Sequence, residues 1–299
     1  MTDLQREPPD CQGSRLLDLV TVVVVSYNSA HCLPALDPLL RCCQHVLLSD
    51  NGSGDGTVEL ARQRWPHAGV LAHGCNKGFG AANNLALARV TTPFALLLNP
   101  DCELSPAGLA ELVLAARDMP EAALLAPQLL DASGRPDVNY RWPSMSWRSS
   151  GPAAEGPACV GFVCGAAMLL RLERFARVGY FDEDFFLYYE DDDLCLRLFD
   201  ARLPMVIRPE VTAVHRSRGS VRGSTPWRGE YWRGYHHAQS KLTFARKHRA
   251  IPGARRLRWI TLLGTTLIIP LRLLAFSPRL LCRMAGRWVG LASWKPDRR

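Results

Sequence analysis

The sequence predicts an α/β protein built on a doubly wound, mostly parallel sheet. Residues 19–28 (LVTVVVVSYN) form a continuous β-branched run, as expected of a strand buried on both faces of a parallel sheet. Shorter apolar runs follow at residues 45–52, 69–73 and 93–99. Helix-like stretches separate these runs, and such alternation favours helices on both faces of the sheet.

Helix-start signals occur between these runs. Thr57 is expected to cap a helix that ends near Pro66. Residues 78–90 (GFGAANNLALARV) are typical of a glycine turn that enters a helix. Ser105 and Pro106 stand in the favoured order of a cap followed by a first-turn proline. These signals support the strand–helix alternation.

Charge is distributed unevenly along the chain. Residues 241–299 hold 14 Lys and Arg but one acid, a net charge of +13, whereas the first 240 residues hold 22 bases and 27 acids, a net of −5. Within the basic part, residues 255–288 mix arginines with apolar side chains, and the uninterrupted neutral run is Trp259–Leu271. This run is shorter than the roughly 20 residues that span a bilayer. We expect a segment that lies on an anionic membrane surface, or alternatively a helix packed on the rest of the protein.

Cysteine spacing and the opening residues indicate a reduced, cytoplasmic protein. The ten cysteines include no Cys-x-x-Cys pair, so a zinc site is not predicted. The chain opens MTDLQREPPD, without the apolar stretch of a secretion signal. No nucleic-acid-binding motif accompanies the basic residues, so we expect no nucleic-acid partner.

Polar clusters follow three of the predicted strands. They are Ser26-Tyr27-Asn28, Asp50-Asn51-Gly52-Ser53 and Asn99-Pro100-Asp101. In open α/β sheets the carboxyl ends of the strands form the ligand crevice. A single Asp at a strand end is usually a turn former or a helix cap. Three clusters on one edge together predict a shared, nucleotide-sized site.

Four consecutive acids, Glu190 to Asp193, follow an aromatic stretch in FFLYYEDDDLCLR (185–197). Apolar surroundings remove water from a carboxylate and raise its pKa, a property suited to a general base. Asp193 has a simpler explanation, because it starts a helix and lies four residues before Arg197. A capped amphipathic helix without chemistry is the alternative for the whole stretch.

The motifs and their order resemble the inverting glycosyltransferases of family 2, which have the nucleotide-sugar-binding GT-A fold. Within that family the chain is most similar to bacterial rhamnosyltransferases of cell-envelope polysaccharide synthesis. The matching segments, between residues 20 and 220, are VVVVSYN, SDNGSGDGT, NKGFGAANN, LLLNPD, GAAMLLR, FDEDFFLYYEDDDLCLRL and HRSRGS.

The resemblance implies a role for each donor-side residue. Asp50 would hold the nucleobase or its ribose, and Ser26, Tyr27 and Asn28 would line the same pocket. In the segment that contains Gly78, glycine would allow the backbone to approach the donor closely. The alternative for this segment is a plain turn that enters a helix. The remaining residues expected beside the donor are Asn76, Gly78, Asn83, Asn99 and Arg216.

The resemblance also implies a metal and a base. Asp101 and His215 would bind Mg²⁺ or Mn²⁺, which neutralises the departing diphosphate; a structural role is the alternative for His215. Where the family often has a second Asp, this chain has Asn99, a weaker ligand. Asp191 would take the proton of the acceptor hydroxyl during an in-line displacement, and Glu190 would bind acceptor hydroxyls or share that proton.

The implied organisation has three parts: a flexible leader (1–18), a GT-A catalytic domain (19–245) and a basic amphipathic extension (246–299). Within the catalytic domain, residues 19–130 form the nucleotide-binding half and residues 131–245 the acceptor half. The expected partners are a nucleotide-diphosphate sugar donor, such as dTDP-rhamnose, and a glycan or polyprenyl-linked glycolipid acceptor. Contact with the inner face of the cell membrane would suit such a lipid.

Two other functions are compatible with a similar sheet. A sugar nucleotidyltransferase would need a glycine-rich, basic loop directly after the first strand, and SYNSAHC (26–32) has none. A degenerate, non-catalytic transferase would bind nucleotide sugars only, and the intact Asp101 and Asp191 argue against it. Acceptor specificity is expected in residues 135–165 and 216–240.

Overall fold

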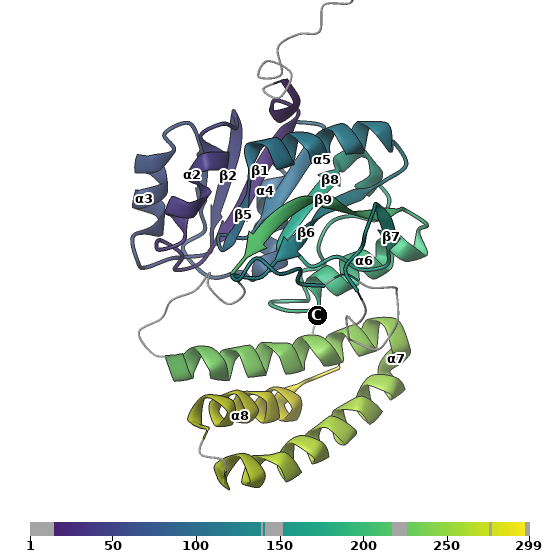
Figure 1. Cartoon of the computed structure of the whole chain (residues 1–299). Coiled ribbons are helices and arrows are strands. Elements are labelled where there is room, and N and C mark those ends of the chain that lie inside the picture. The colour runs from purple at the N-terminus through teal and green to yellow at the C-terminus, as the bar shows by residue number, and fades with distance from the viewer. Residues whose placement is uncertain (1–14, 139, 141–151, 217–225, 275–276, 297–299) are drawn as a thin grey trace, which may run out of the picture. The chain divides into compact units, whose positions relative to one another are not determined.

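The computed structural model describes residues 15–138, 140, 152–216, 226–274 and 277–296 (Figure 1). Most of the predicted leader therefore lies outside the described residues, as does part of both segments expected to set acceptor specificity. In chain order, the elements are β1 (Val20–Ser26), η1 (Leu33–Leu36), α2 (Asp37–Leu40), β2 (His45–Asp50), α3 (Thr57–Arg64), β3 (Gly69–Ala72), α4 (Phe79–Leu87), β4 (Phe94–Leu98), β5 (Cys102–Leu104), α5 (Pro106–Asp118), β6 (Leu124–Leu130), β7 (Ala158–Val160), β8 (Ala167–Arg171), η2 (Leu172–Phe175), α6 (Glu190–Asp200), β9 (Met205–His215), α7 (Pro226–Leu274) and α8 (Pro278–Ser293).

The strands form one mixed sheet in the order β3-β2-β1-β4-β8-β6-β9-β5, with β7 paired to β9. Strands β3, β2, β1 and β4 are parallel, as the sequence predicts. Beyond β4 the sheet is mixed, because β8 runs antiparallel to both β4 and β6 whereas β6 and β9 are parallel. The predicted α/β class with a doubly wound sheet is confirmed, and its parallel part is the half that carries the three polar clusters.

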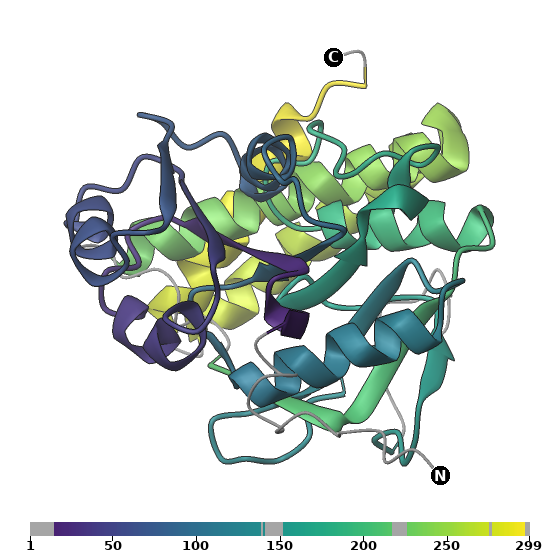
Figure 2. The same ribbon diagram turned by 90° about the horizontal axis from the view of Figure 1, so that it is seen from above.

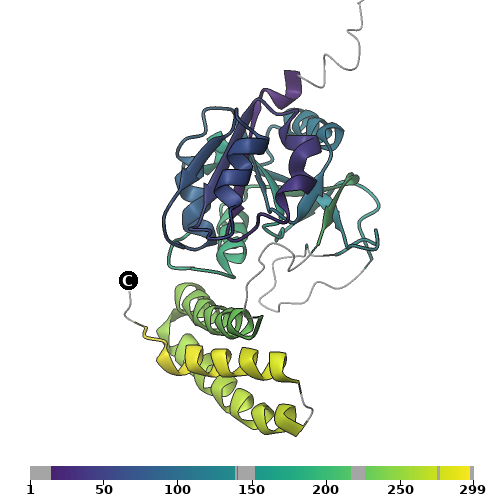
Figure 3. The same ribbon diagram turned by 90° about the vertical axis from the view of Figure 1, so that its left-hand side faces the viewer.

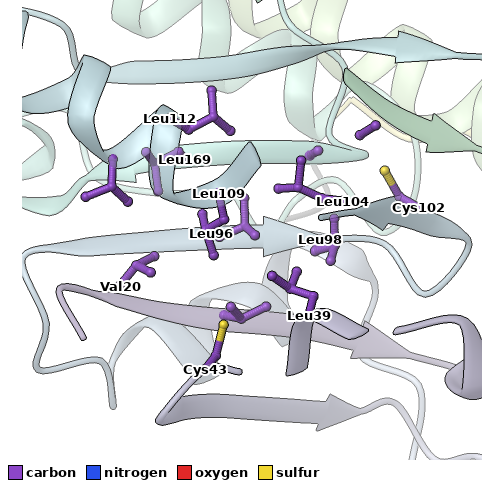
Figure 4. Packing of buried hydrophobic residues seen from close by; sticks show 14 of the residues in the cluster. Val20, Leu39, Cys43, Leu96, Leu98, Cys102, Leu104, Leu109, Leu112 and Leu169 are labelled. Atoms are coloured by element: carbon purple, nitrogen blue, oxygen red, sulfur yellow. The ribbon is translucent and has the colours of Figure 1, made fainter. Parts of the chain in front are cut away.

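The core lies between the sheet and the helices that cover it. Every residue of β1 and β4 is buried, which explains their unbroken apolar sequences. Leu109 and Leu112 of α5 pack with Leu96 of β4 and Leu169 of β8 (Figure 4). Helix α5 packs along β6, β8 and β9 (Figure 2). This core holds the carboxyl ends of β1, β2 and β4 in place.

Two helix starts test the predicted caps. Ser105 accepts a hydrogen bond from Gly108 N at 3.0 Å and begins α5 ahead of Pro106, as predicted. The prediction for Thr57 is wrong by one residue, because Gly56, at φ +83°, is the cap and Thr57 is the first helical residue. The Thr57 hydroxyl instead accepts a hydrogen bond from Ser29 N at 3.0 Å.

The chain divides into two compact units. One comprises residues 1–76, 82–180 and 194–221, and contains the sheet; the other comprises residues 77–81, 181–193 and 222–299. In the second unit, α7 breaks at Ala250, whose φ of +63° and ψ of +167° are not helical, and Pro252 follows. Helix α8 lies between the two parts of α7, residues 226–249 and 251–274 (Figures 1 and 3). A C-terminal helical extension is therefore present, as predicted.

Within the described residues, no helix is long and apolar enough to cross a membrane.

Candidate active site

The carboxyl ends of β1, β2 and β4 meet at one edge of the sheet. Ser26 aligns with Asp50 across the β1–β2 pair, and the Ser26 hydroxyl donates a hydrogen bond to Asp50 Oδ1 at 2.9 Å. Val24 aligns with Leu98, the last residue of β4, so Asn99 leaves the sheet at the same edge. The prediction that the three polar clusters share an edge is confirmed.

Asp50 organises the loop that follows β2. Its carboxylate, 2% exposed, accepts hydrogen bonds from the Ser26 and Ser53 hydroxyls and from the backbone N–H groups of Gly52 and Ser53. These four donors occupy both of its oxygens. The structure thus gives Asp50 the turn-forming role considered above, and its contact with a nucleotide stays a prediction.

Tyr27 and Asn28 differ in how far they are available to a ligand. The Tyr27 side chain is 37% exposed and therefore presents a ring on which a base can stack. Asn28 adopts a left-handed backbone, φ +52°, and its side-chain oxygen accepts a hydrogen bond from Gly54 N at 2.9 Å. Asn28 thus braces the loop after β2.

Asp101 and His215 form a close pair at the start of β5 and the end of β9. In the antiparallel β5–β9 pair, His215 lies opposite Cys102, the residue that follows Asp101, and this pairing brings Asp101 and His215 together. The buried Asp101 Oδ1 lies 3.6 Å from His215 Nε2. Within the described residues, no group of three or more His, Cys, Asp or Glu side chains could hold a metal by itself.

This donor set fits a divalent cation that arrives with a diphosphate. Mg²⁺ is usually bound by one or two carboxylates and completes its shell with phosphate oxygens and water. A buried carboxylate beside an imidazole would supply two protein ligands and would leave the remaining positions to the substrate. Asn99, partly buried, donates its backbone N–H to Ala166 O at 2.9 Å and so shapes the turn that presents Asp101.

Arg216 is a weaker candidate for binding the donor than its sequence position indicates. Its guanidinium forms an ion pair with Glu103 at 2.8 Å, and its side chain is largely exposed. Its backbone N–H donates to Asp101 O at 2.9 Å.

The glycine segment before α4 divides between the two compact units. Asn76, partly buried, and Asn83, buried in α4, belong to the unit of the sheet. Gly78 belongs to the second unit, where it contacts the backbone of Phe186: with φ at +94°, a Cβ at Gly78 would lie 2.5 Å from Phe186 O. The group that approaches Gly78 closely is therefore the backbone of Phe186.

Glu190 and Asp191 begin helix α6. Glu190 is 6% exposed, and within the described residues its Oε2 has no hydrogen-bond partner. Burial, reinforced by the neighbouring Asp191 charge, raises the pKa of Glu190 well above its ordinary value. Asp191 is only partly buried, and its Oδ1 accepts a hydrogen bond from Asp192 N at 2.9 Å. The acidic pair thus contains one buried and one accessible carboxyl group.

The two residues before this pair have unusual backbones. Tyr188 and Tyr189 both have φ at +70°, a region that costs an aromatic residue on the order of 1–3 kcal/mol. Their rings meet the edge of His237 with centroid distances of 5.6 and 5.4 Å. The Ser240 hydroxyl donates to Leu187 O at 2.9 Å. The first part of α7 thus holds the chain in this strained conformation directly ahead of Glu190.

Asp193 anchors the same loop through a buried ion cluster. Asp193, fully buried, lies 2.8 Å from both Lys247 Nζ and His248 Nε2, and Lys247 also pairs with Asp182. Arg197, the partner that helical spacing suggests, donates to the carbonyl of Val178 at 2.7 Å. Long-range ion pairs of this kind leave no local signal in the sequence.

Residues 21–172 match the family model Glycosyl transferase family 2, which is more than half of the chain. The chain belongs to glycosyltransferase family 2. This glycosyltransferase is 30% identical over 246 residues to N-acetylglucosaminyl-diphospho-decaprenol L-rhamnosyltransferase of Mycobacterium tuberculosis, covering 69% of this chain and 78% of the relative. It is 27% identical over 195 residues to a low-salt glycan biosynthesis hexosyltransferase of Haloferax volcanii, covering 61% and 62%. The predicted resemblance to bacterial rhamnosyltransferases is confirmed.

Solved structures show that the fold of this glycosyltransferase is shared. A mannosyltransferase from Pyrobaculum calidifontis, in complex with GDP-Man and Mn²⁺, has a TM-score of 0.54 at 16% identity, covering 94% of this chain and 92% of that one. GalNAc-T7 with UDP, GalNAc and Mn²⁺ has a TM-score of 0.51 at 15% identity, covering 76% and 51%. These likenesses support the predicted GT-A fold.

The residues of α7 that support the acidic pair of this glycosyltransferase were not predicted from the sequence. His237, Ser240, Lys247 and His248 all contact the segment 181–193. The composition of the sequence contains one signal for these residues: Ser240 and Lys247 lie in a stretch after residue 226 that mixes polar and aromatic side chains. From the sequence alone, this stretch is expected to take part in acceptor recognition or to belong to the basic extension.

Proposed function

We propose that this glycosyltransferase moves a sugar from a nucleotide-diphosphate donor to a hydroxyl of a glycolipid acceptor, with inversion of the anomeric configuration. The observation that carries the proposal is the pair formed by the buried Glu190 and the partly buried Asp191 in the first turn of α6. Such a pair supplies one carboxyl that retains its proton and one that is available as a base. The family membership and the Mycobacterium tuberculosis relative support the same reaction.

The donor is bound at the edge of the sheet. Tyr27 offers its exposed ring to the nucleobase, and the loop held by Asp50 forms the floor of that pocket. Asp101 and His215 hold a divalent cation, Mg²⁺ or Mn²⁺. When bound, this cation offsets the negative charge that develops on the departing diphosphate.

Asp191 acts as the general base. It takes the proton of the acceptor hydroxyl while that oxygen attacks the anomeric carbon from the side opposite the diphosphate, so a single displacement inverts the configuration. Base assistance of this kind is worth on the order of 10²–10⁴ in rate. Burial, reinforced by the Asp191 charge, raises the pKa of Glu190 and so favours its neutral form, which avoids repulsion between two adjacent carboxylates.

The acceptor is a polyprenyl-linked glycolipid at the inner face of the cell membrane. The second part of α7 exposes a row of large apolar side chains: Trp259, Ile260, Leu263, Leu267 and Leu271. Leu263, Leu267 and Leu271 follow each other at four-residue spacing and are 63–64% exposed. Exposed arginines, Arg255, Arg256 and Arg272, flank the row and suit anionic headgroups.

The donor sugar is rhamnose linked to dTDP. The named activity of the Mycobacterium tuberculosis relative supports rhamnose. A thermal-shift screen of dTDP-rhamnose, UDP-galactofuranose and UDP-glucose, each with and without Mn²⁺, tests this choice. The correct donor stabilises the protein by about 2.7 kcal/mol at a hundredfold excess over its dissociation constant.

The Asp191→Asn variant tests the reaction itself. We expect transfer and donor hydrolysis to fall by about 10²–10⁴ while the affinity for the donor is unchanged. Asp192→Asn, one residue further along α6, is the matched control and retains activity. Full activity in Asp191→Asn, or no hydrolysis by the wild-type protein with any nucleotide sugar that it binds, would exclude the proposal; the second result would indicate a non-catalytic binding protein.

A further inference from the structure

Two rows of basic residues lie on α7 and α8, which pack against each other in the second compact unit. On the first part of α7, Arg233, His237 and Lys241 follow at four-residue spacing and therefore share one face of the helix. On α8, Arg279, Arg283 and Arg287 repeat the same spacing. Basic residues at this period on two neighbouring helices create a local concentration of positive charge.

Backbone contact between the helices holds the rows together. A Cβ at Gly234 of α7 would lie 2.0 Å from Arg283 O, and one at Gly286 of α8 would lie 1.9 Å from Tyr231 O. Only glycine permits such an approach. The crossing therefore fixes Arg283 and Arg287 against the face of α7 that carries His237 and Lys241.

Much of this charge has no acidic partner. The buried Glu230 accounts for two of the cations, because it pairs with Arg233 at 3.0 Å and with Arg283 at 3.9 Å. In the part of the chain that the structure describes, no ion pair joins a carboxylate to Lys241 or to Arg287. Both side chains are nevertheless partly buried.

The pKa shifts agree with this charge inventory. Burial, followed by the charges of Arg287 and Arg249, lowers the pKa of Lys241. Burial also lowers the pKa of Arg287. His237, buried and close to Arg287 and Lys241, has its pKa lowered to about 4 and is neutral at pH 7. Desolvated cations that repel one another cost stability unless an anion joins them.

The basic rows adjoin the acidic pair. The His237 ring lies 5.4 Å from that of Tyr189, the residue before Glu190, and Arg287 is close enough to Tyr189 to interact electrostatically with its hydroxyl group. A ligand bound between Lys241 and Arg287 would thus lie beside the segment that presents Asp191.

We propose that Lys241 and Arg287, assisted by Arg283, bind the diphosphate of the acceptor lipid. This inference rests on the proposed function, transfer to a polyprenyl-linked glycolipid; in the acceptor named for the Mycobacterium tuberculosis relative, a diphosphate joins the sugar to the polyprenol. Arginine recognises phosphate oxygens with two hydrogen bonds, and lysine adds a point charge. Because the acceptor sugar is attached directly to this diphosphate, binding it here brings the sugar hydroxyls close to Asp191.

Calorimetric titration with inorganic pyrophosphate and with geranyl diphosphate, both in EDTA, tests the subsite. The Lys241→Gln, Arg287→Gln double variant should bind geranyl diphosphate at least about tenfold more weakly than the wild-type protein. Arg117→Gln, which removes an exposed arginine from α5, should bind it normally. Equal affinity in the double variant and the wild-type protein would overturn the proposal.

Two further measurements identify the source of the phosphate and exclude a structural role. Affinity for phosphatidylglycerol vesicles should be unchanged in the double variant; a loss of vesicle binding with normal geranyl diphosphate binding would assign the cluster to lipid headgroups and overturn the proposal. The melting temperature of the double variant should be higher than that of the wild-type protein, because two desolvated charges are removed. A lower melting temperature together with normal diphosphate binding would indicate a structural role for Lys241 and Arg287 and overturn the proposal. Nucleotide-sugar binding and hydrolysis, assayed separately, report on the proposed function alone.

Discussion

Asp193 Oδ1 lies 2.8 Å from His248 Nε2, and this contact ties the first turn of α6 to α7. Asp193 is fully buried, and the Lys247 ammonium group lies 2.8 Å from the same carboxylate. The pairs join residues that lie more than fifty positions apart in the chain. This ion cluster therefore holds the turn of α6 that carries the proposed base, Asp191.

Asp193→Asn should destabilise the protein by about 2 kcal/mol, because it removes the charge from a buried cluster while it retains the side-chain volume. Lys247 keeps Asp182 as a partner, which limits the loss. Urea unfolding measures the change, and transfer activity should fall with it because the segment ahead of Asp191 loosens. Asp200→Asn, at the exposed end of the same helix, should change stability by less than about 0.5 kcal/mol. Equal effects of the two substitutions would contradict the anchoring role.

Gly78→Ala should cost more than Gly74→Ala. Both glycines have a positive φ, but a Cβ at Gly78 would lie 2.5 Å from Phe186 O, whereas a Cβ at Gly74 would have no atom within 4 Å. Backbone strain alone accounts for about 1 kcal/mol at Gly74. At Gly78 the segment at Phe186 must also shift, so both unfolding free energy and kcat should decrease. The comparison fails if the two alanine variants unfold at the same urea concentration.

Glu190→Gln should make the protein more stable at neutral pH. Burial raises the pKa of Glu190 in the folded protein, so the folded state binds this proton more tightly than the unfolded state. Wild-type stability should therefore decline as the pH rises above about 4.3, the ordinary pKa of Glu, until the folded pKa is passed. Glutamine carries no such proton, so unfolding free energies of the two proteins should agree near pH 4 and separate at higher pH. A wild-type protein that is the more stable of the two at pH 8 would contradict the assigned direction.

Asp101→Asn should abolish the stabilisation that Mn²⁺ provides in the presence of dTDP. Asp101 is the buried carboxylate of the pair with His215, and an amide is a poorer metal ligand. Thermal unfolding with dTDP alone and with dTDP plus Mn²⁺ isolates the metal contribution. Asp118→Asn, an exposed acid on α5, should respond as the wild-type protein does. A full Mn²⁺ response in Asp101→Asn would place the cation elsewhere.

The Leu263→Asp, Leu267→Asp double variant should bind phosphatidylglycerol vesicles at least about tenfold more weakly, because burying one leucine is worth on the order of 1.5–3 kcal/mol. Both leucines are more than 60% exposed, so the substitutions should leave stability nearly unchanged. Leu114→Asp, an exposed leucine of α5, controls for added charge. Flotation measures binding. If the double variant instead alters only the oligomeric state, the row is an interface between protein copies.

Local patterns made much of the fold predictable. β1 and β4 are buried along their whole length, so their sequences are continuously apolar and could be recognised directly. Ser105 caps α5 through a bond to a residue three positions away, and that too is a local signal. The entry of β8 antiparallel to β4 depended on pairing between distant segments, and no local pattern encodes it.

The sequence also predicted the positions of several candidate-site residues, but not the contacts that they make. Strand ends located Ser26, Asp50 and Asp101, because the carboxyl ends of adjacent parallel strands lie at one edge. The sequence did not reveal that four donors surround Asp50, since these contacts depend on the course of the loop. Nor did the sequence reveal that Gly78 packs against the backbone of Phe186.

By itself, the sequence determined the strand–helix alternation, the residues at the strand ends and the acidic pair at the start of α6. These are properties of neighbouring residues, and periodicity or spacing expresses them. Only the tertiary structure decided that Glu190 is the buried member of the pair, that Asp193 is held by Lys247 and His248, and that Lys241 and Arg287 have no acidic partner among the described residues. Burial and charge compensation depend on segments that are distant in the chain, so they arise only once the helices have packed.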